Sequence, residues 1–291
     1  MTTQGMGPDD IVIDSMTFAE VQSHFELARQ EGWNPGLHDC DCAWAVDPDA
    51  FIALRRDGEI IGGGSIFRHS DAFGFMGLFI VKPEHRRLGA GKQLWHERLR
   101  RLRARLAPDA SIGMDGVFQM EHFYKAGGFQ THYETVRYTG MATCDDPAQA
   151  DLCEEGGAIP DLLAYDRAKT GYDRTGLLRA WLEQDQNLVA VHATDGQVSG
   201  FAIARPAFSG YKIGPLLADT PAIASALLDH LFDRLVGHFV QIDVPTPNSA
   251  AVALVQSHQF KPDFACARMY FGDRAAADLS PIFGGMSLEF G

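Results

Sequence analysis

Residues 78–106, LFIVKPEHRRLGAGKQLWHERLRRLRARL, carry the strongest structural signal in this chain. The stretch opens with an apolar run that Pro83 ends, which indicates a buried strand. It closes with apolar residues at steps of three and four, which predict one face of a helix: Leu88, Gly91, Trp95, Leu99, Leu102 and Leu106. Between strand and helix lies the segment 86–91, RRLGAG. Because glycines admit a ligand close to the backbone and a helix start offers unpaired N–H groups, this loop predicts an anion site.

Two common phosphate motifs do not describe this loop. A Walker loop requires Gly at position 86 and Ser or Thr after Lys92, where the chain has Arg86 and Gln93. A dinucleotide fingerprint requires a third Gly at position 94, which is Leu94. The remaining pattern, Val-x-Pro-x-x-Arg-x-x-Gly-x-Gly between a strand and a helix, resembles the acetyl-CoA pyrophosphate loop of the GNAT (Gcn5-related) N-acyltransferases. The structural alternative is an ordinary strand-to-helix turn with a solvated basic helix face.

Composition limits the class of protein. The 291 residues are 46% hydrophobic and 22% charged, which is ordinary for a globular chain and enough for two domains. No apolar run could span a bilayer, and the N-terminus shows no export signal. The odd number of cysteines, 5, fits a reducing compartment, and the net charge of −13 argues against nucleic acid as the main partner. We expect a cytoplasmic monomer or homodimer without a membrane or nucleic-acid partner.

The first half alternates strand and helix signals. Expected elements are a strand at 11–13, a helix from the capping box at 17–20 to Gly32, hairpin strands around Asp57-Gly58, a strand at 73–81, the long helix, a strand at 112–117, a short helix at 121–129 and a strand at 135–138. This order predicts an α/β fold with a mixed sheet and helices on both faces. It is also the GNAT order.

The segment 33–42, WNPGLHDCDC, combines turn formers with polar groups and aromatic neighbours. Such a loop is a candidate substrate-binding wall, with Trp33, Asn34, His38 and Asp39 as the candidate residues. A structural loop with packed Trp side chains is the alternative. The Cys-x-Cys pair has no second pair at zinc-finger spacing, so no metal site is predicted.

Tyr124 is the candidate general acid. The run Tyr124-Lys125-Ala126-Gly127-Gly128-Phe129 is similar to the x-Tyr-x-x-x-Gly-Phe helix start of GNAT enzymes, and the resemblance implies that the Tyr protonates the departing CoA thiolate. The chemistry agrees, because a phenol of pKa about 10 can reprotonate a thiolate of pKa about 8.5. A Tyr merely packed at a helix end is the alternative.

The base that deprotonates the acceptor is less clear from the sequence. Asp115 lies on the strand where many GNAT enzymes present a carboxylate or a water network, but it could instead brace a turn. His122 and Glu121 are weaker candidates, and a water chain without a single base is equally plausible. Many family members have an Asn seven residues before the Tyr; Val117 stands there, so that CoA contact cannot be carried over.

The second half repeats the first. Residues 188–200 mirror residues 50–62, Asp243 corresponds to Asp115, and Arg268 corresponds to Arg137. Two copies of one fold are the economical interpretation. The second copy lacks the Arg-x-x-Gly-x-Gly loop, carries Asp219 near its helix start, where it would repel a pyrophosphate, and has Val255 at the position of Tyr124. We expect it neither to hold CoA tightly nor to catalyse.

The whole chain resembles tandem GNAT proteins with a YitH-type C-terminal domain, from about residue 11 to residue 272. We therefore predict a catalytic GNAT domain at 8–140, an acidic linker at 141–158 and a degenerate GNAT-like domain at 159–291. The resemblance implies acetyl-CoA as co-substrate, with no metal. Its expected binding residues are Phe79, Ile80, Val81, Arg86, Arg87, Leu88, Gly89, Ala90, Gly91 and Lys92.

The predicted activity is acetyl transfer from acetyl-CoA to a primary amine of a small molecule. Direct attack by the amine is expected, because no Cys stands out as a placed nucleophile. Two alternatives remain at this point: a non-catalytic acyl-CoA-binding regulatory protein and a protein-lysine acetyltransferase.

Overall fold

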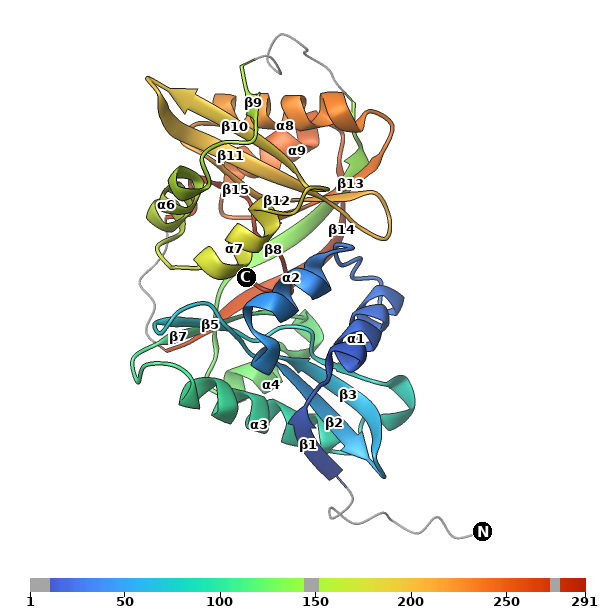
Figure 1. Ribbon diagram of the computed structural model, residues 1–291. Coiled ribbons are helices and arrows are strands. Elements are labelled where there is room, and N and C mark those ends of the chain that lie inside the picture. Colours follow the sequence, from blue (N-terminus) through green and yellow to red (C-terminus); the bar gives the residue numbers. More distant parts are fainter. Residues whose placement is uncertain (1–10, 144–151, 273–277) are drawn as a thin grey trace.

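The structure is a computed structural model that describes residues 11–143, 152–272 and 278–291. Residues 144–151 of the predicted acidic linker, and the N-terminal residues on which the export-signal expectation rests, lie outside these ranges. Two halves of similar architecture lie one above the other, and β8 and β14 run between them (Figure 1).

The first half follows the expected order of elements. Its helices are α1 (Phe18–Gln30), α2 (Asp39–Val46), α3 (Ala90–Ala104) and α4 (Glu121–Ala126). Its strands are β1 (Ile11–Ser15), β2 (Phe51–Arg56), β3 (Glu59–Ser65), β4 (Phe67–Arg68), β5 (Phe73–Phe75), β6 (Ile80–Val81), β7 (Ser111–Gly116) and β8 (Gln130–Met141). The predicted capping box of Thr17 and Glu20 and the Asp57-Gly58 hairpin turn are both present.

The second half repeats this order. Its helices are α6 (Ile159–Thr170), α7 (Thr175–Leu182), α8 (Pro221–Leu235) and α9 (Ser249–Ser257). Its strands are β9 (Glu154–Glu155), β10 (Leu188–Thr194), β11 (Gln197–Pro206), β12 (Tyr211–Ala218), β13 (Phe239–Pro245), β14 (Lys261–Phe271) and β15 (Ile282–Gly284). Thr220 caps α8, since its side chain accepts a hydrogen bond from the N–H of Ile223.

The two halves exchange their last strands. Strand β8 of the first half pairs with β13 of the second, and β14 of the second half pairs with β7 of the first. The large sheet therefore runs in the order β4-β5-β7-β14-β8-β13-β12-β11-β10-β9 through both halves, while β1, β2, β3 and β6 form a smaller sheet. Although the sequence divides near residue 140, the hydrogen-bonded sheet does not.

Two reciprocal ion pairs mark this exchange. Arg137 on β8 faces Asp243 on β13, with N–O distances of 2.7 and 2.9 Å. Arg268 on β14 faces Asp115 on β7, with distances of 2.8 and 2.6 Å. The repeated Asp and Arg of the sequence thus pair across the copies rather than within them. All four side chains are buried, so each bidentate pair compensates charges that would otherwise be costly.

The predicted strand at 73–81 is interrupted. Residues 76–79 are irregular, so β5 pairs with β7 in the large sheet while β6 pairs with β3 in the small one. Leu78 has a φ of 51°, in the left-handed region, and the backbone of Glu289 lies directly against Gly77. The two sheets consequently separate at this point, between β6 and β7.

In the second half the corresponding opening is filled by the chain itself. Strands β12 and β13 pair only at residues 211–213 and 240–242 and then diverge. Strand β15 pairs with β12 beyond that point, and the N–H of Gly285 donates to the carbonyl of Asp243 over 2.7 Å. An extended segment of this protein therefore lies where the first half is open.

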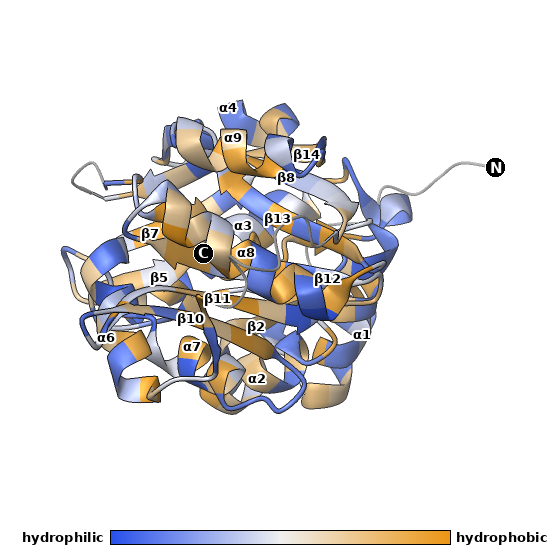
Figure 2. Cartoon of the chain, turned by 90° about the horizontal axis from the view of Figure 1, so that it is seen from above, coloured by the Kyte–Doolittle hydropathy of each residue, from blue (hydrophilic) through white to orange (hydrophobic). Residues whose placement is uncertain are grey.

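The predicted loop at 33–42 is partly helical, because residues from Asp39 onward form α2. Cys40, Cys42 and Ala43 are buried there, and α2 packs against α7 of the second half. This packing gives an apolar face to a segment whose local sequence favours turns. Figure 2 shows that the central strands β2 and β11 are mostly hydrophobic, whereas the surrounding loops are mostly hydrophilic.

Candidate active site

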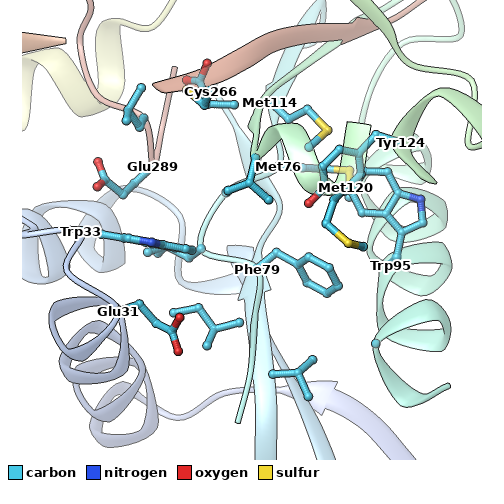
Figure 3. A pocket seen from close by; sticks show the side chains of 18 of the residues that line it. Glu31, Trp33, Met76, Phe79, Trp95, Met114, Met120, Tyr124, Cys266 and Glu289 are labelled. Carbon is cyan, nitrogen blue, oxygen red and sulfur yellow. The ribbon is translucent and has the colours of Figure 1, made fainter. Parts of the chain in front are cut away.

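A cavity of about 870 Å³ occupies the opening between β6 and β7. One wall is the segment from Met76 to Val81, and the opposite wall includes Met114, Asp115 and Val117. In Figure 3, Trp33 and Glu289 lie on one side of the cavity and Trp95 and Tyr124 on the other, with Phe79 between them. The cavity thus joins the end of α1, the start of α3 and segments of the second half.

The predicted anion loop borders this cavity. Gly89 has a φ of 86° and precedes the first residue of α3, so the left-handed turn that aims the loop into the helix requires glycine. The side chain of Arg86 ties the loop to its neighbours. Its Nε donates a hydrogen bond to the carbonyl of Val81 over 2.7 Å, and its Nη2 donates one to Glu31 over 2.5 Å. Of the predicted cofactor residues, eight line the cavity: Phe79, Ile80, Val81, Arg86, Arg87, Gly89, Gly91 and Lys92.

Two predicted loop residues do not line the cavity. Leu88, expected on the apolar face of α3, is 60% exposed, whereas Ala90 is fully buried beneath the helix start. Their side chains point away, and only their N–H groups remain available as ligands for an anion. The buried face of α3 consists of Ala90, Leu94, Trp95, Arg98 and Leu102. Of the predicted apolar face only Trp95 and Leu102 belong to this buried set, and the buried arginine was not predicted.

The irregular segment at the opening presents backbone donors. The side chain of His24 on α1 contacts the carbonyl of Leu78 through Nε2 at 2.8 Å, which holds the left-handed residue in place. The N–H groups of Leu78 and Phe79 have no hydrogen-bond acceptor among the described residues. Burial lowers the pKa of His24 to about 4, so the imidazole is neutral near pH 7 and Nε2 is its proton donor.

Tyr124 lies in the wall of the cavity, within the short helix α4. The residue is 4% exposed, and its ring lies 4.8 Å from the ring of Trp95. Burial raises the pKa of Tyr124 to about 12, while the nearby charge of Arg98 acts in the opposite direction. The phenol is therefore protonated near neutral pH, the state that a general acid requires.

Asp115 also lines the cavity, but its carboxylate is already hydrogen-bonded within the protein. Both of its oxygens accept hydrogen bonds from Arg268 of the second half. Burial raises the pKa of Asp115 against the opposing charge of Arg268. The pKa of Arg268 is lowered by burial but raised overall, well above its ordinary value, by that same carboxylate, which fits an ionised pair. Asp115 could act as a base only from within this pair.

The four residues predicted to bind the acceptor substrate do not lie together in the structure. Trp33 lines the cavity, but Asn34, His38 and Asp39 do not. The side chain of Asn34 bonds Ser209 and Gln241, and the buried Asp39 pairs with Arg205. Asn34 and Asp39 thus bind the first half to the second, while His38 immediately precedes α2.

The second half contributes cavity residues that sequence reasoning missed. They are Asp263, Phe264 and Cys266, from β14, together with Leu288 and Glu289 beyond β15. Glu289 is buried and its carboxylate accepts from Lys212 at 3.1 and 3.2 Å. No local motif marks these positions, because the exchanged strand β14 and the C-terminal segment beyond β15 bring them to the cavity. Burial raises the pKa of the Cys266 thiol well above its ordinary value, which leaves it a poor nucleophile.

In the described ranges, no group of three or more His, Cys, Asp or Glu side chains could hold a metal ion. No helix in the same ranges is sufficiently long and apolar to cross a membrane.

Comparison with known families identifies the class of protein. Residues 18–129 match the Acetyltransferase (GNAT) family, and residues 162–284 match an Acetyltransferase (GNAT) domain. The chain therefore belongs to the GNAT acetyltransferases, and it is an N-acetyltransferase built from two tandem domains of this fold. Membership of this family implies the use of an acyl-CoA.

Among individual proteins, the chain is similar to the holothin acyltransferase of Pseudoalteromonas sp. (strain SANK 73390). The two are 28% identical over 272 residues, which cover 91% of this chain and 90% of that protein. It is also similar to YitH of Bacillus subtilis (strain 168), described as an uncharacterized N-acetyltransferase, with 24% identity over 79% of this chain and 80% of that protein. The latter agrees with the resemblance to YitH-type proteins in the sequence.

Solved structures share the fold. A putative acetyltransferase from Pyrococcus horikoshii superimposes with a TM-score of 0.83 at 21% identity and covers 100% of this chain and 99% of its own. A tandem GNAT protein from the clavulanic acid biosynthesis pathway superimposes with a TM-score of 0.60 at 13% identity, over 91% of this chain and 100% of its own. These similarities establish the two-domain architecture.

Proposed function

We propose that this protein transfers an acetyl group from acetyl-CoA to a primary amine of a small molecule, and that only its first half binds the donor. The observation that carries this proposal is the contrast between the two openings. In the first half the opening is a cavity that ends at the glycine loop of α3. In the second half β15 fills the corresponding place.

The contrast between the two openings also suggests the orientation of acetyl-CoA in the cavity. Strand β15 shows that an extended chain fits between the diverging strands of this fold and bonds to their edges. In the first half, pantetheine takes this place and pairs with the backbone of residues 79–81. The diphosphate then reaches the N–H groups of residues 87–92, where the helix dipole favours negative charge. A Cβ added at Gly91 would point toward cavity residues, with Val81 3.4 Å away, so the glycine keeps this space open.

The thioester carbonyl is placed at the irregular segment. The N–H groups of Leu78 and Phe79 supply donors for the oxygen that becomes negative when the amine attacks. Attack by the nitrogen forms the C–N bond, the C–S bond breaks, and the Tyr124 hydroxyl gives its proton to sulfur. The raised pKa of Cys266 supports direct attack rather than a covalent cysteine intermediate.

The proton of the acceptor amine leaves through water in the cavity. A direct transfer to Asp115 is the less favourable route, because Arg268 occupies both carboxylate oxygens. The acceptor enters beside Trp33 and the second-half residue Glu289, on the side of the cavity opposite Tyr124. Phe264 of the second half also lines the cavity. This enclosed position between the halves supports a small amine better than a lysine within a folded protein.

A thiol-release screen tests the proposal. Purified protein is mixed with acetyl-CoA and panels of small amines, aminoglycosides and lysine peptides, and free CoA is measured. Turnover with at least one small amine and not with the peptides is expected. Turnover with peptides alone, or binding of acetyl-CoA without turnover on any amine, would contradict the small-amine assignment.

A further inference from the structure

Arg98 is a buried cation whose bonding is incomplete. The residue is 0% exposed, and its Nη2 donates to the carbonyls of Ser65 and Gly77 over 2.6 and 2.5 Å. Its Nε and Nη1 have no hydrogen-bond partner in the part of the chain that the structure describes. Buried polar groups are normally satisfied, so two free donors on a buried guanidinium require an explanation.

Other buried cations in the described ranges have a carboxylate that compensates their charge. Arg137, Arg174, Arg205, Lys212 and Arg268 each pair with a buried carboxylate. Arg98 has no carboxylate within salt-bridge distance among the described residues, and it is a cavity-lining residue. The missing counter-charge is therefore expected from a ligand in the cavity.

The position of Arg98 indicates which part of the ligand supplies this negative charge. Arg98 lies eight positions after Ala90, or about 12 Å along the helix, so the diphosphate at the helix start is too distant. Arg98 instead bonds Gly77, where the strands separate, and its guanidinium lies 5.2 Å from the centre of the Phe79 ring. The thioester would lie at this end of the donor.

We propose that Arg98 binds the CoA thiolate that forms when the thioester breaks. The inference rests on the proposed function, since it assumes that acyl-CoA occupies the first-half cavity. As the C–S bond breaks, its electron pair remains on sulfur, and Arg98 compensates this negative charge. Tyr124 then transfers its hydroxyl proton to sulfur and recovers one from solvent. Arg98 keeps its own protons throughout.

The titratable groups that face Arg98 leave a clear pH window for a test. They are His24 on α1 and Tyr124 on α4, and both interact with its charge. Burial lowers the pKa of His24 to about 4 and raises the pKa of Tyr124 to about 12. Between pH 6.5 and 8.5 neither changes charge. Burial also lowers the pKa of Arg98, to about 9, so its guanidinium stays mostly charged across this window and a rise in affinity with pH reports ionisation of the thiol.

The experiment compares binding of CoA and desulfo-CoA by calorimetry at several pH values in this window. A free thiol has a pKa of about 8.5, and a neighbouring guanidinium lowers it. A bound pKa one unit lower makes the affinity ratio of CoA to desulfo-CoA rise about fivefold from pH 6.5 to 8.5 in the wild type. Arg98→Met should abolish the rise, and Arg98→Lys should retain part of it.

Arg101→Met is the matched control, because Arg101 lies on the same helix, bonds the carbonyl of Ile13 and does not line the cavity. Its affinity ratio should rise as in the wild type. If Arg98→Met does not fold, the wild-type measurement alone remains decisive. A ratio that stays constant with pH overturns the role of Arg98 while leaving the proposed function intact, whereas failure of both ligands to bind contradicts the proposed function itself.

Discussion

At the scale of single residues, the site combines a buried phenol with buried charges that are almost all paired. Tyr124 is protonated, lies against Trp95 and faces the cavity. Asp115, the carboxylate that the sequence singles out, instead serves with Arg268 to join β7 to β14. The local environments of the two residues therefore differ: Tyr124 is a buried proton donor, whereas Asp115 belongs to a structural ion pair.

Replacing Tyr124 by Phe tests the proton donor. We expect kcat to fall about 100-fold or more, because the thiolate then leaves without a proton from the protein. The dissociation constant for acetyl-CoA, measured by calorimetry, should change less than twofold. Tyr211→Phe, at a tyrosine of β12 in the second half outside this cavity, should leave both values unchanged. Full activity of the Tyr124→Phe enzyme would remove the general acid from the mechanism.

The second prediction concerns the contribution of His24 to the pH dependence of the free energy of unfolding. Its pKa is about 6.5 when the chain is unfolded and about 4 when it is folded, so protons bind preferentially to the unfolded chain between these values. Its stabilising contribution is complete above pH 6.5 and is lost as the pH falls toward 4. From pH 7 to pH 5 this amounts to about 2 kcal/mol.

Urea unfolding at pH 7 and pH 5 measures this loss. His24→Gln should be less stable at pH 7 but should lose about 2 kcal/mol less than the wild type on acidification. His96→Gln, an exposed substitution on α3, should lose as much as the wild type. Equal pH dependence in all three proteins would show that His24 is not buried as a neutral imidazole.

At the scale of elements, the start of α3 distinguishes the two copies. Gly91 lines the cavity, whereas the corresponding α8 begins with Pro221 and Ala222 after a capping Thr220. Gly91→Val should weaken acetyl-CoA binding at least tenfold, since its methyl groups occupy space that the diphosphate requires. The Cβ itself meets the protein at ordinary contact distances, so the melting temperature should change little.

Ala222→Val is the matched control for that substitution. It places the same valine side chain at the second residue of the corresponding helix, in the copy where we propose that no donor binds. Its affinity for acetyl-CoA should equal that of the wild type. A loss of affinity in this variant, or an unchanged affinity in Gly91→Val, would place the donor elsewhere.

At the scale of the whole molecule, the strand exchange makes the halves interdependent. A fragment of residues 1–143 lacks β14, which lies between its own β7 and β8. We expect this fragment to show no cooperative thermal unfolding by circular dichroism, because the buried Asp115 would lose Arg268 and the sheet would be interrupted. Co-expression with residues 144–291 should restore a folded complex, and a stably folded lone fragment would refute the interdependence.

The sequence alone was sufficient for features that depend on neighbours in the chain. The glycine loop, the long helix, the Asp57-Gly58 hairpin turn and the repeat follow from local spacing, and both GNAT matches agree with the repeat. Where local preference and tertiary packing agree, periodicity predicts the structure well. The functional roles given to Tyr124 and the loop residues stay predictions until they are measured.

Only the tertiary structure decided what the strand exchange brings together. It places Glu289 beside Gly77, pairs Asp115 with Arg268 and buries Arg98 without a carboxylate, although these residues have no motif in common. It also breaks the apolar run at 73–81, because His24 bonds the left-handed Leu78 and the backbone of Glu289 lies against Gly77, whose own backbone still bonds Ser65 of β3. Such contacts join residues far apart in the chain, and local spacing carries no information about them.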